Sequence, residues 1–258
     1  MNVNNLWSEY KSLGIGEQLD YDKFALYSII THSTAIEGST ISEAENQVLF
    51  DKGISPNKPI AEQLMNLDLK AAYGEAFRIA DARSPITVAV LCQLAAQVMK
   101  NTGSRYSTAL DEFDAAKGEL RRINVSAGRG GASYMAWQKV PDRLQAFCTW
   151  LDKTRKALDS MTAEQVYCAS FEAHFRLVSI HPWADGNGRM ARLLMNLIQR
   201  EAGVMLSIVK KEKRAQYIES LAKAQESDNA SLFLEFMLRH HTENMQAQIR
   251  DYRKSVKS

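Results

Sequence analysis

The sequence lacks the features that mark several classes of protein. Its three cysteines, Cys92, Cys148 and Cys168, are odd in number and far apart, which argues against a disulfide framework and against a zinc site. No stretch reaches the ~18 consecutive apolar residues of a membrane span, and the N-terminal residues lack a signal-peptide pattern. We therefore expect a cytoplasmic protein with no membrane partner.

An excess of charge of either sign is also missing. The chain has 32 Lys and Arg against 30 Asp and Glu, a formal net charge of +2. Because nucleic-acid binding needs clustered Lys and Arg on one face, we expect no nucleic-acid partner. With 258 residues, of which 45% are hydrophobic, the chain can bury a sizeable core, and 5 prolines and 13 glycines exclude a collagen-like or low-complexity chain.

Apolar residues recur at spacings of three and four along most of the chain, which is the period of an amphipathic helix. In residues 162–180 the pattern follows a capping box formed by Thr162 and Gln165. Ser84 and Pro85 are interpreted as the N-cap and first residue of a helix that ends before Gly103. The same pattern predicts helices over residues 22–36, 42–51, 60–82, 141–157, 189–202, 211–225 and 231–250. The predicted class is all-α.

Two stretches interrupt the helical pattern. Residues 118–140 carry Gly128, Gly130 and Gly131 between short apolar runs, which favours a small β-hairpin over a phosphate loop because no G-K-[ST] follows. Residues 53–59, GISPNKP, are the best linker candidate. We therefore expect an N-terminal helical lobe over residues 1–58 and a main body over residues 59–258.

One loop carries most of the residues suited to chemistry, with the sequence HPWADGNGRMAR from His181 to Arg192. A glycine-flanked turn that leads into a helix presents unpaired backbone N–H groups and the positive end of the helix dipole to an anion. Histidine, with an ordinary pKa near ~6.5, is a natural proton acceptor, and Asp185 offers an oxygen ligand for Mg²⁺. Two arginines, Arg189 and Arg192, can bind further phosphates. Together these residues indicate transfer of a phosphate-containing group.

This loop resembles the signature of the Fic family, H-P-F-x-[DE]-G-N-G-R-x-x-R. It departs from the signature at Trp183, which we expect to pack into the core. The resemblance spans roughly residues 60–239 and includes the expected hairpin, which is similar to the family's flap. It implies a Fic-fold helical bundle and a protein adenylyltransferase, an enzyme that transfers AMP from ATP to a protein hydroxyl and releases pyrophosphate.

The resemblance also implies roles for the matching residues. His181 would deprotonate the attacking hydroxyl, and Asp185 would bind Mg²⁺ between the α- and β-phosphates. Arg192 would bind the γ-phosphate, and Arg189 would support the leaving phosphates. The α-phosphate would lie against Gly186, Asn187 and Gly188. His181, Asn187 and Arg189 are thus the predicted catalytic residues.

Binding partners follow from the same resemblance. The flap would hold a target segment by strand addition, and the target would be a protein with a Ser, Thr or Tyr hydroxyl, this chain itself included. Tyr217 is a candidate contact for the adenine side of ATP, while packing against Leu221 explains it equally well. The sequence leaves the oligomeric state open, with a homodimer as one option.

A second motif, near the N-terminus, resembles the family's inhibitory motif [ST]-x-x-x-E-[GN], here from Ser33 to Gly38. A carboxylate in the last turn of a helix lies at the unfavourable end of the dipole, so Glu37 is expected to have a cation nearby. The resemblance implies that this cation is Arg192 and that Glu37 takes the space of the γ-phosphate. The structural alternative is a Gly38 C-cap ahead of a capping box between Ser42 and Glu45.

Other functions fit the same residues. Within enzymes the alternatives are removal of AMP, for which Glu37 would orient a water, and transfer of another nucleotide group. A different class is a non-catalytic module that senses nucleotide or binds a partner, because fold and motif alone do not establish turnover.

Overall fold

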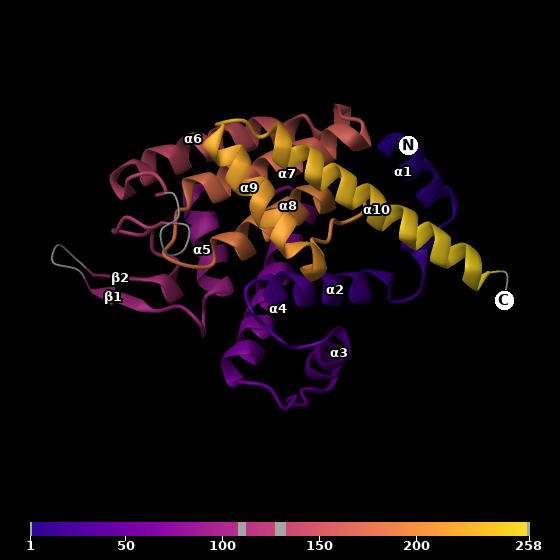
Figure 1. Ribbon diagram of the computed structural model, residues 1–258, viewed down its shortest axis with the longest axis horizontal. Helices are drawn as coiled ribbons and strands as arrows, with labels where there is room; N and C mark the ends of the chain where they lie inside the picture. Colours follow the sequence, from indigo (N-terminus) through magenta and orange to yellow (C-terminus); the bar gives the residue numbers. More distant parts are fainter. Residues whose placement is uncertain (1, 108–111, 127–132, 257–258) are drawn as a thin grey trace.

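The chain folds as a bundle of helices with one small hairpin, so the all-α prediction is confirmed (Figure 1). The computed structural model describes residues 2–107, 112–126 and 133–256. Its centre is α8 (Asn187–Glu201), which packs against α7 (Ala163–Ile180) and α4 (Ile60–Asp81). Twelve of the fifteen residues of α8 are buried, which identifies it as the central helix.

The remaining helices surround this centre. On the N-terminal side are α1 (Val3–Ser12), α2 (Tyr21–Ile36) and α3 (Glu43–Lys52), and the others are α5 (Val88–Val98), α6 (Val140–Lys156), α9 (Arg214–Glu226) and α10 (Ser231–Ser255). Short 3₁₀ turns lie at Ile15–Glu17, Ala115–Lys117, Trp137–Lys139, Leu158–Ser160 and Lys211–Lys213. No helix in the described ranges combines the length and the apolar character needed to cross a bilayer.

Both predicted parts of the chain contribute to one hydrophobic core. Leu6 and Ile30, from the first 58 residues, belong to the same buried cluster as Leu69 and Leu193. The first and last helices also meet in space, because α1 packs against α10 as well as against α7. The N-terminal helices are therefore held against the main body by apolar packing.

Helix ends agree with the sequence at two capping boxes and differ at one N-cap. The boxes of Thr162 with Gln165 and of Ser42 with Glu45 are both formed. The prediction that Ser84 caps α5 is wrong: Thr87 is the N-cap, and its hydroxyl accepts a hydrogen bond from the N–H of Val90. The N–H of Ser84 instead donates to the carbonyl of Ile79, so Ser84 closes the end of α4.

A strand pair that the sequence did not predict lies ahead of the expected hairpin. β1 (Arg105–Ser107) and β2 (Glu112–Asp114) pair antiparallel, with Tyr106 opposite Phe113. Within residues 118–140, Ser126 and Ser133 form a single antiparallel bridge, and the N–H of Tyr134 donates to the carbonyl of Val125 at 3.0 Å. The three glycines on which the prediction rested lie outside the described residues. Two chain arms therefore run antiparallel at the expected flap, without a sheet in the described residues there.

Candidate active site

The loop from His181 to Gly186 connects the two central helices, and its backbone fixes the position of each functional side chain. α7 ends at Ile180, and His181 follows as its C-cap with a left-handed φ of 51°, donating its N–H to the carbonyl of Leu177. α8 begins at Asn187, with Gly186 as N-cap at φ 80°. Because Gly186 has no side chain that could accept hydrogen bonds, the first-turn N–H groups of α8 receive no side-chain cap and can face an anion.

Trp183 and Asn187 hold this loop in shape. Trp183 is 1% exposed, as predicted, and its indole N–H donates to the carbonyl of Gly118 at 3.0 Å. The Asn187 side chain accepts from the N–H of Trp183 at 3.1 Å and donates to its carbonyl at 2.8 Å. The Asn187 amide thus closes the loop, and its contact with the α-phosphate stays a prediction.

Gly188 lies against the cationic part of the site. A Cβ at this position would be 2.7 Å from Oε1 of Glu37 and 3.1 Å from Nη1 of Arg192. A Cβ at Gly186 would meet Sδ of Met99 at 2.7 Å. At both glycines an added side chain would therefore displace the neighbouring side chains from their present positions.

Arg192 is buried, and four contacts fix its guanidinium. It donates to Oε1 of Glu37 at 2.5 Å, to the hydroxyl of Ser33 at 2.8 Å, to the carbonyl of Ser33 at 3.0 Å and to the hydroxyl of Tyr217 at 3.3 Å. The ion pair between Glu37 and Arg192 that the resemblance implied is thus present. Glu37 itself is the C-cap of α2, and Gly38 follows it with φ 108°, so the predicted glycine turn lies one residue beyond the C-cap.

The charges of this pair stabilise one another. Burial acts to raise the pKa of Glu37, but the attraction and hydrogen bond of Arg192, followed by the charges of Arg189 and Arg214, lower it below its ordinary value. The Glu37 side chain is 35% exposed and that of Arg192 only 3%. The guanidinium is therefore fixed inside the protein, while its partner is reached in part by solvent.

Tyr217 connects Arg192 to a buried histidine. Its hydroxyl lies 2.8 Å from Nε2 of His174 and accepts from Arg192, and the residue is 1% exposed. Burial lowers the pKa of His174 well below its ordinary value, so this imidazole is neutral. Tyr217 thus has a packing and hydrogen-bonding role in the structure, and its contact with adenine stays a prediction.

Arg189 is buried beside the end of α5. It donates to the carbonyl of Val98 at 3.4 Å and to Sδ of Met99 at 2.9 Å, and its Nη2 lies 3.7 Å from Oδ2 of Asp185. Burial lowers the pKa of Arg189. The Met99 contact has no signal in the sequence, since Met99 reads as an ordinary apolar helix residue.

Asp185 is the one carboxylate of the loop and fits a magnesium ligand. Its side chain is 59% exposed, and Oδ1 accepts from the N–H of Gly186 at 2.6 Å. Within the described ranges no three His, Cys, Asp or Glu side chains gather around a common point. A single carboxylate suits Mg²⁺, which commonly binds through one or two carboxylates and completes its shell with substrate phosphates.

His181 is covered by the second arm of the expected flap, which begins at Ser133. The ring of Tyr134 stacks on the imidazole, with 3.7 Å between ring centroids and 20° between planes. Burial lowers the pKa of His181 to about 4. The imidazole is therefore neutral at pH 7, which is the state in which it can accept a proton.

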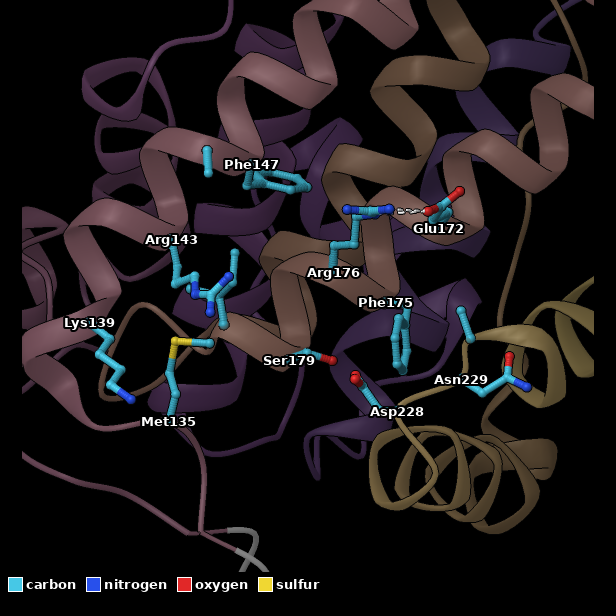
Figure 2. Close-up of a pocket in the computed structure, with 13 residues that line it drawn as sticks. Met135, Lys139, Arg143, Phe147, Glu172, Phe175, Arg176, Ser179, Asp228 and Asn229 are labelled. Carbon is cyan, nitrogen blue, oxygen red and sulfur yellow. Dashed lines mark hydrogen bonds and ion pairs between the residues drawn. The ribbon is translucent and has the colours of Figure 1, made fainter.

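A cavity of about 700 Å³ has Met135, which follows Tyr134, among its lining residues (Figure 2). Ile180, the neighbour of His181 in sequence, lines it as well. Figure 2 shows Lys139 and Arg143 on one side and Asp228 and Asn229 on the other. None of the predicted site residues lines this cavity.

Fold and site together define a helical protein in which a loop that begins with His181 leads into the N-terminus of the central helix α8. Residues 85–199 match the Fic/DOC family, so the chain contains a Fic/DOC domain. Protein adenylyltransferase fic-1 of Caenorhabditis briggsae is 28% identical over 224 residues, 85% of this chain and 40% of the relative. Protein adenylyltransferase Fic of Drosophila melanogaster is 31% identical over 209 residues, 80% and 39%. The chain thus spans about 40% of the length of these curated relatives.

Solved structures support the same fold. A Fic domain-containing signaling protein from Bacteroides thetaiotaomicron superposes with a TM-score of 0.79 at 20% identity, covering 98% of this chain and 97% of the other. Fic-1 from Caenorhabditis elegans has a TM-score of 0.76 at 24% identity, covering 98% and 71%. The predicted Fic fold is confirmed.

Proposed function

We propose that this chain is a protein adenylyltransferase that transfers AMP from ATP to a side-chain hydroxyl of a protein. The observation that carries the proposal is the arrangement of one loop, where a neutral imidazole precedes a helix start with two buried arginines, His181, Arg189 and Arg192. The names of the relatives that share this domain give the activity its particular form.

In the proposed reaction, the imidazole of His181 accepts the proton of the target hydroxyl. The hydroxyl oxygen then bonds to the α-phosphorus, the bond from that phosphorus to the oxygen shared with the β-phosphate breaks, and pyrophosphate leaves. The N–H groups at the start of α8, next to Gly186 and Gly188, lie where they can stabilise the charge that builds on the α-phosphate. Arg189 and Arg192 would bind the leaving phosphates.

Asp185 would hold Mg²⁺ in this scheme. The ion, when bound, would offset negative charge on the leaving phosphates. Oδ1 of Asp185 accepts a hydrogen bond from the N–H of Gly186, and Oδ2 lies 3.7 Å from Nη2 of Arg189.

We further propose that Glu37 inhibits the enzyme. Its carboxylate forms an ion pair with the guanidinium of Arg192, and this guanidinium would otherwise bind the γ-phosphate. The same carboxylate lies against Gly188 at the proposed anion-binding start of α8. ATP would then bind in a pose unsuited to in-line attack. The proposal keeps a cytoplasmic location and a target with a Ser, Thr or Tyr hydroxyl.

The test is intact mass spectrometry after incubation with ATP and Mg²⁺ of the wild type, Glu37→Gly, and Glu37→Gly with His181→Ala. We expect an added AMP on Glu37→Gly, much less on the wild type, and none on the double variant. Absence of the adduct from Glu37→Gly, with or without a lysate of candidate targets, while ATP binding persists, would refute transfer and favour a nucleotide-binding module.

A further inference from the structure

Arg121 joins the flap to the histidine loop. Its Nε donates to the carbonyl of His181 at 2.7 Å, Nη1 to the carbonyl of Ile123 at 2.7 Å and Nη2 to the carbonyl of Met135 at 2.6 Å. Its backbone N–H also donates to the carbonyl of Pro182 at 3.0 Å. One side chain therefore contacts the backbone of both flap arms and of His181.

The burial of the Arg121 guanidinium costs free energy, because the charged group loses its hydration. Arg121 is 1% exposed, and burial lowers its pKa with no carboxylate of the described residues acting against that effect. A buried charge without a counter-charge is retained only where its hydrogen bonds compensate for lost hydration. All three side-chain nitrogens donate to carbonyl groups, and these carbonyls lie between the flap and His181.

These contacts set the relation between His181 and Tyr134. Met135, whose carbonyl Arg121 binds, directly follows Tyr134, and the ring of Tyr134 lies on the imidazole. The planar fork of arginine fixes two carbonyls in a defined geometry, which the single nitrogen of lysine cannot do.

We propose that Arg121 is a positioning residue for the transfer reaction, which fixes the flap arms relative to the imidazole of His181. This inference rests on the proposed adenylyltransferase function. In this proposal Arg121 touches neither ATP nor the target. It keeps the flap edge, along which a target segment would pair, at a fixed distance from the imidazole of His181.

The test compares Arg121→Lys with a matched control, both in the Glu37→Gly background. Lysine keeps the positive charge and removes the fork, so electrostatic effects on His181 are kept. The control is Arg155→Lys, which removes another buried fork, bonded to Glu201 at 2.7 Å and to the carbonyl of Ser84 at 2.9 Å, at the end of α4 and away from the histidine loop.

Three quantities are measured on each variant: the single-turnover rate of AMP incorporation by intact mass, the Kd of ATP by calorimetry, and the pKa of His181 by NMR titration. We expect Arg121→Lys to slow incorporation by at least about tenfold, because small misplacements of reacting groups have effects of this order, with the Kd of ATP within about twofold. The flap would loosen, and the pKa of His181 would rise toward its ordinary ~6.5. Besides Arg121, the charges that act on this imidazole are Asp185 and Glu37, and only Glu37 is changed, equally in both variants.

Each result has a distinct meaning. The inference would be overturned if Arg121→Lys kept a rate within twofold of the parent and a His181 pKa within about 0.3 of the parent value. Equal slowing by Arg155→Lys would overturn it as well. If the Glu37→Gly parent itself incorporates no AMP, the proposed function fails, and the titration of His181 still tests whether Arg121 positions the flap. A fall in Tm beyond that of Arg155→Lys would be followed by repeating the comparison with Arg121→Gln at a lower temperature.

Discussion

The ring of Tyr134 lies flat on the imidazole of His181, at 3.7 Å between centroids. This contact covers the proposed base from the flap side and contributes to the burial that lowers its pKa to about 4. A base with so low a pKa is a weak proton acceptor. A target hydroxyl that displaced Tyr134 would therefore also restore the basicity of the group it needs.

Tyr134→Ala should raise the pKa of His181 toward ~6.5, because removal of the ring exposes the imidazole to water. NMR titration of the His181 C2 proton measures this directly. Tyr134→Phe keeps the stacked ring and is expected to leave the pKa near 4. Equal pKa values in the alanine and phenylalanine variants would mean that other groups bury the imidazole.

Ser33→Ala should release Arg192 in part. The hydroxyl accepts from Nε of Arg192, while the carbonyl of Ser33 and the carboxylate of Glu37 remain in place. Hydrogen bonds to charged groups contribute about 1.5–3 kcal/mol, and about 1.4 kcal/mol is tenfold, so we expect AMP incorporation to rise by roughly tenfold or more, but less than in Glu37→Gly. Ser28→Ala, on the same helix but bonded to Glu43, is the control and should have no effect on incorporation.

Gly188→Ala should abolish transfer even when Glu37 is glycine. The new Cβ would lie 3.1 Å from Nη1 of Arg192, within the space proposed for phosphate. Calorimetry should show ATP binding weakened by at least about tenfold, a loss of ~1.4 kcal/mol. Gly74→Ala is the matched control, because its Cβ meets no atom within 4 Å, and in mid-helix it should stabilise the fold by about 1 kcal/mol.

Much of this site could be predicted because its residues are adjacent in sequence. The capping box at Thr162, the loop at His181 and the glycines at the start of α8 lie within one stretch, and local chemistry fixes their geometry. Glu37 lies 155 residues away from Arg192, yet its place at a helix end indicated a missing cation.

What the sequence did not indicate depends on contacts between distant segments. Arg121 follows a leucine and precedes a second arginine, a pattern that an exposed residue could also have. Only the folded chain brings it to the His181 carbonyl. The stack of Tyr134 on His181 and the contact of Met99 with Arg189 are of the same kind. The Ser84 N-cap failed because Thr87, three residues on, competes for the same helix and is bonded to it.

Acid should destabilise the protein through its buried histidines. Burial lowers the pKa of His181 to about 4, that of His241 to about 3, and that of His174 well below its ordinary value. Each imidazole is neutral when folded and takes up a proton on unfolding below ~6.5, so the stability that it contributes is complete above that pH and falls as the pH drops toward its folded pKa.

His241→Asn isolates one of these groups. His241 bonds the hydroxyl of Ser207 through Nδ1, which the asparagine amide can replace, and it lies outside the histidine loop. Between pH 5.5 and 4 the free energy of unfolding should fall less steeply in the variant, by about 1.4 kcal/mol per pH unit. Urea unfolding at several pH values measures the slope, and an unchanged slope would mean that His241 is already protonated when folded.

The packing of α2 sets how the proposed inhibition could be relieved. The helix that carries Glu37 also buries Ile29, Ile30 and Ile36 in the core, and each such side chain contributes about 1.5–3 kcal/mol. Withdrawing the whole helix would therefore amount to partial unfolding. Glu37 behaves as a covalently tethered ligand of Arg192, present at an effective concentration that dilution cannot lower. Its release is then a rotation of one partly exposed side chain, so a small effector that binds this one carboxylate would be enough to relieve the proposed inhibition.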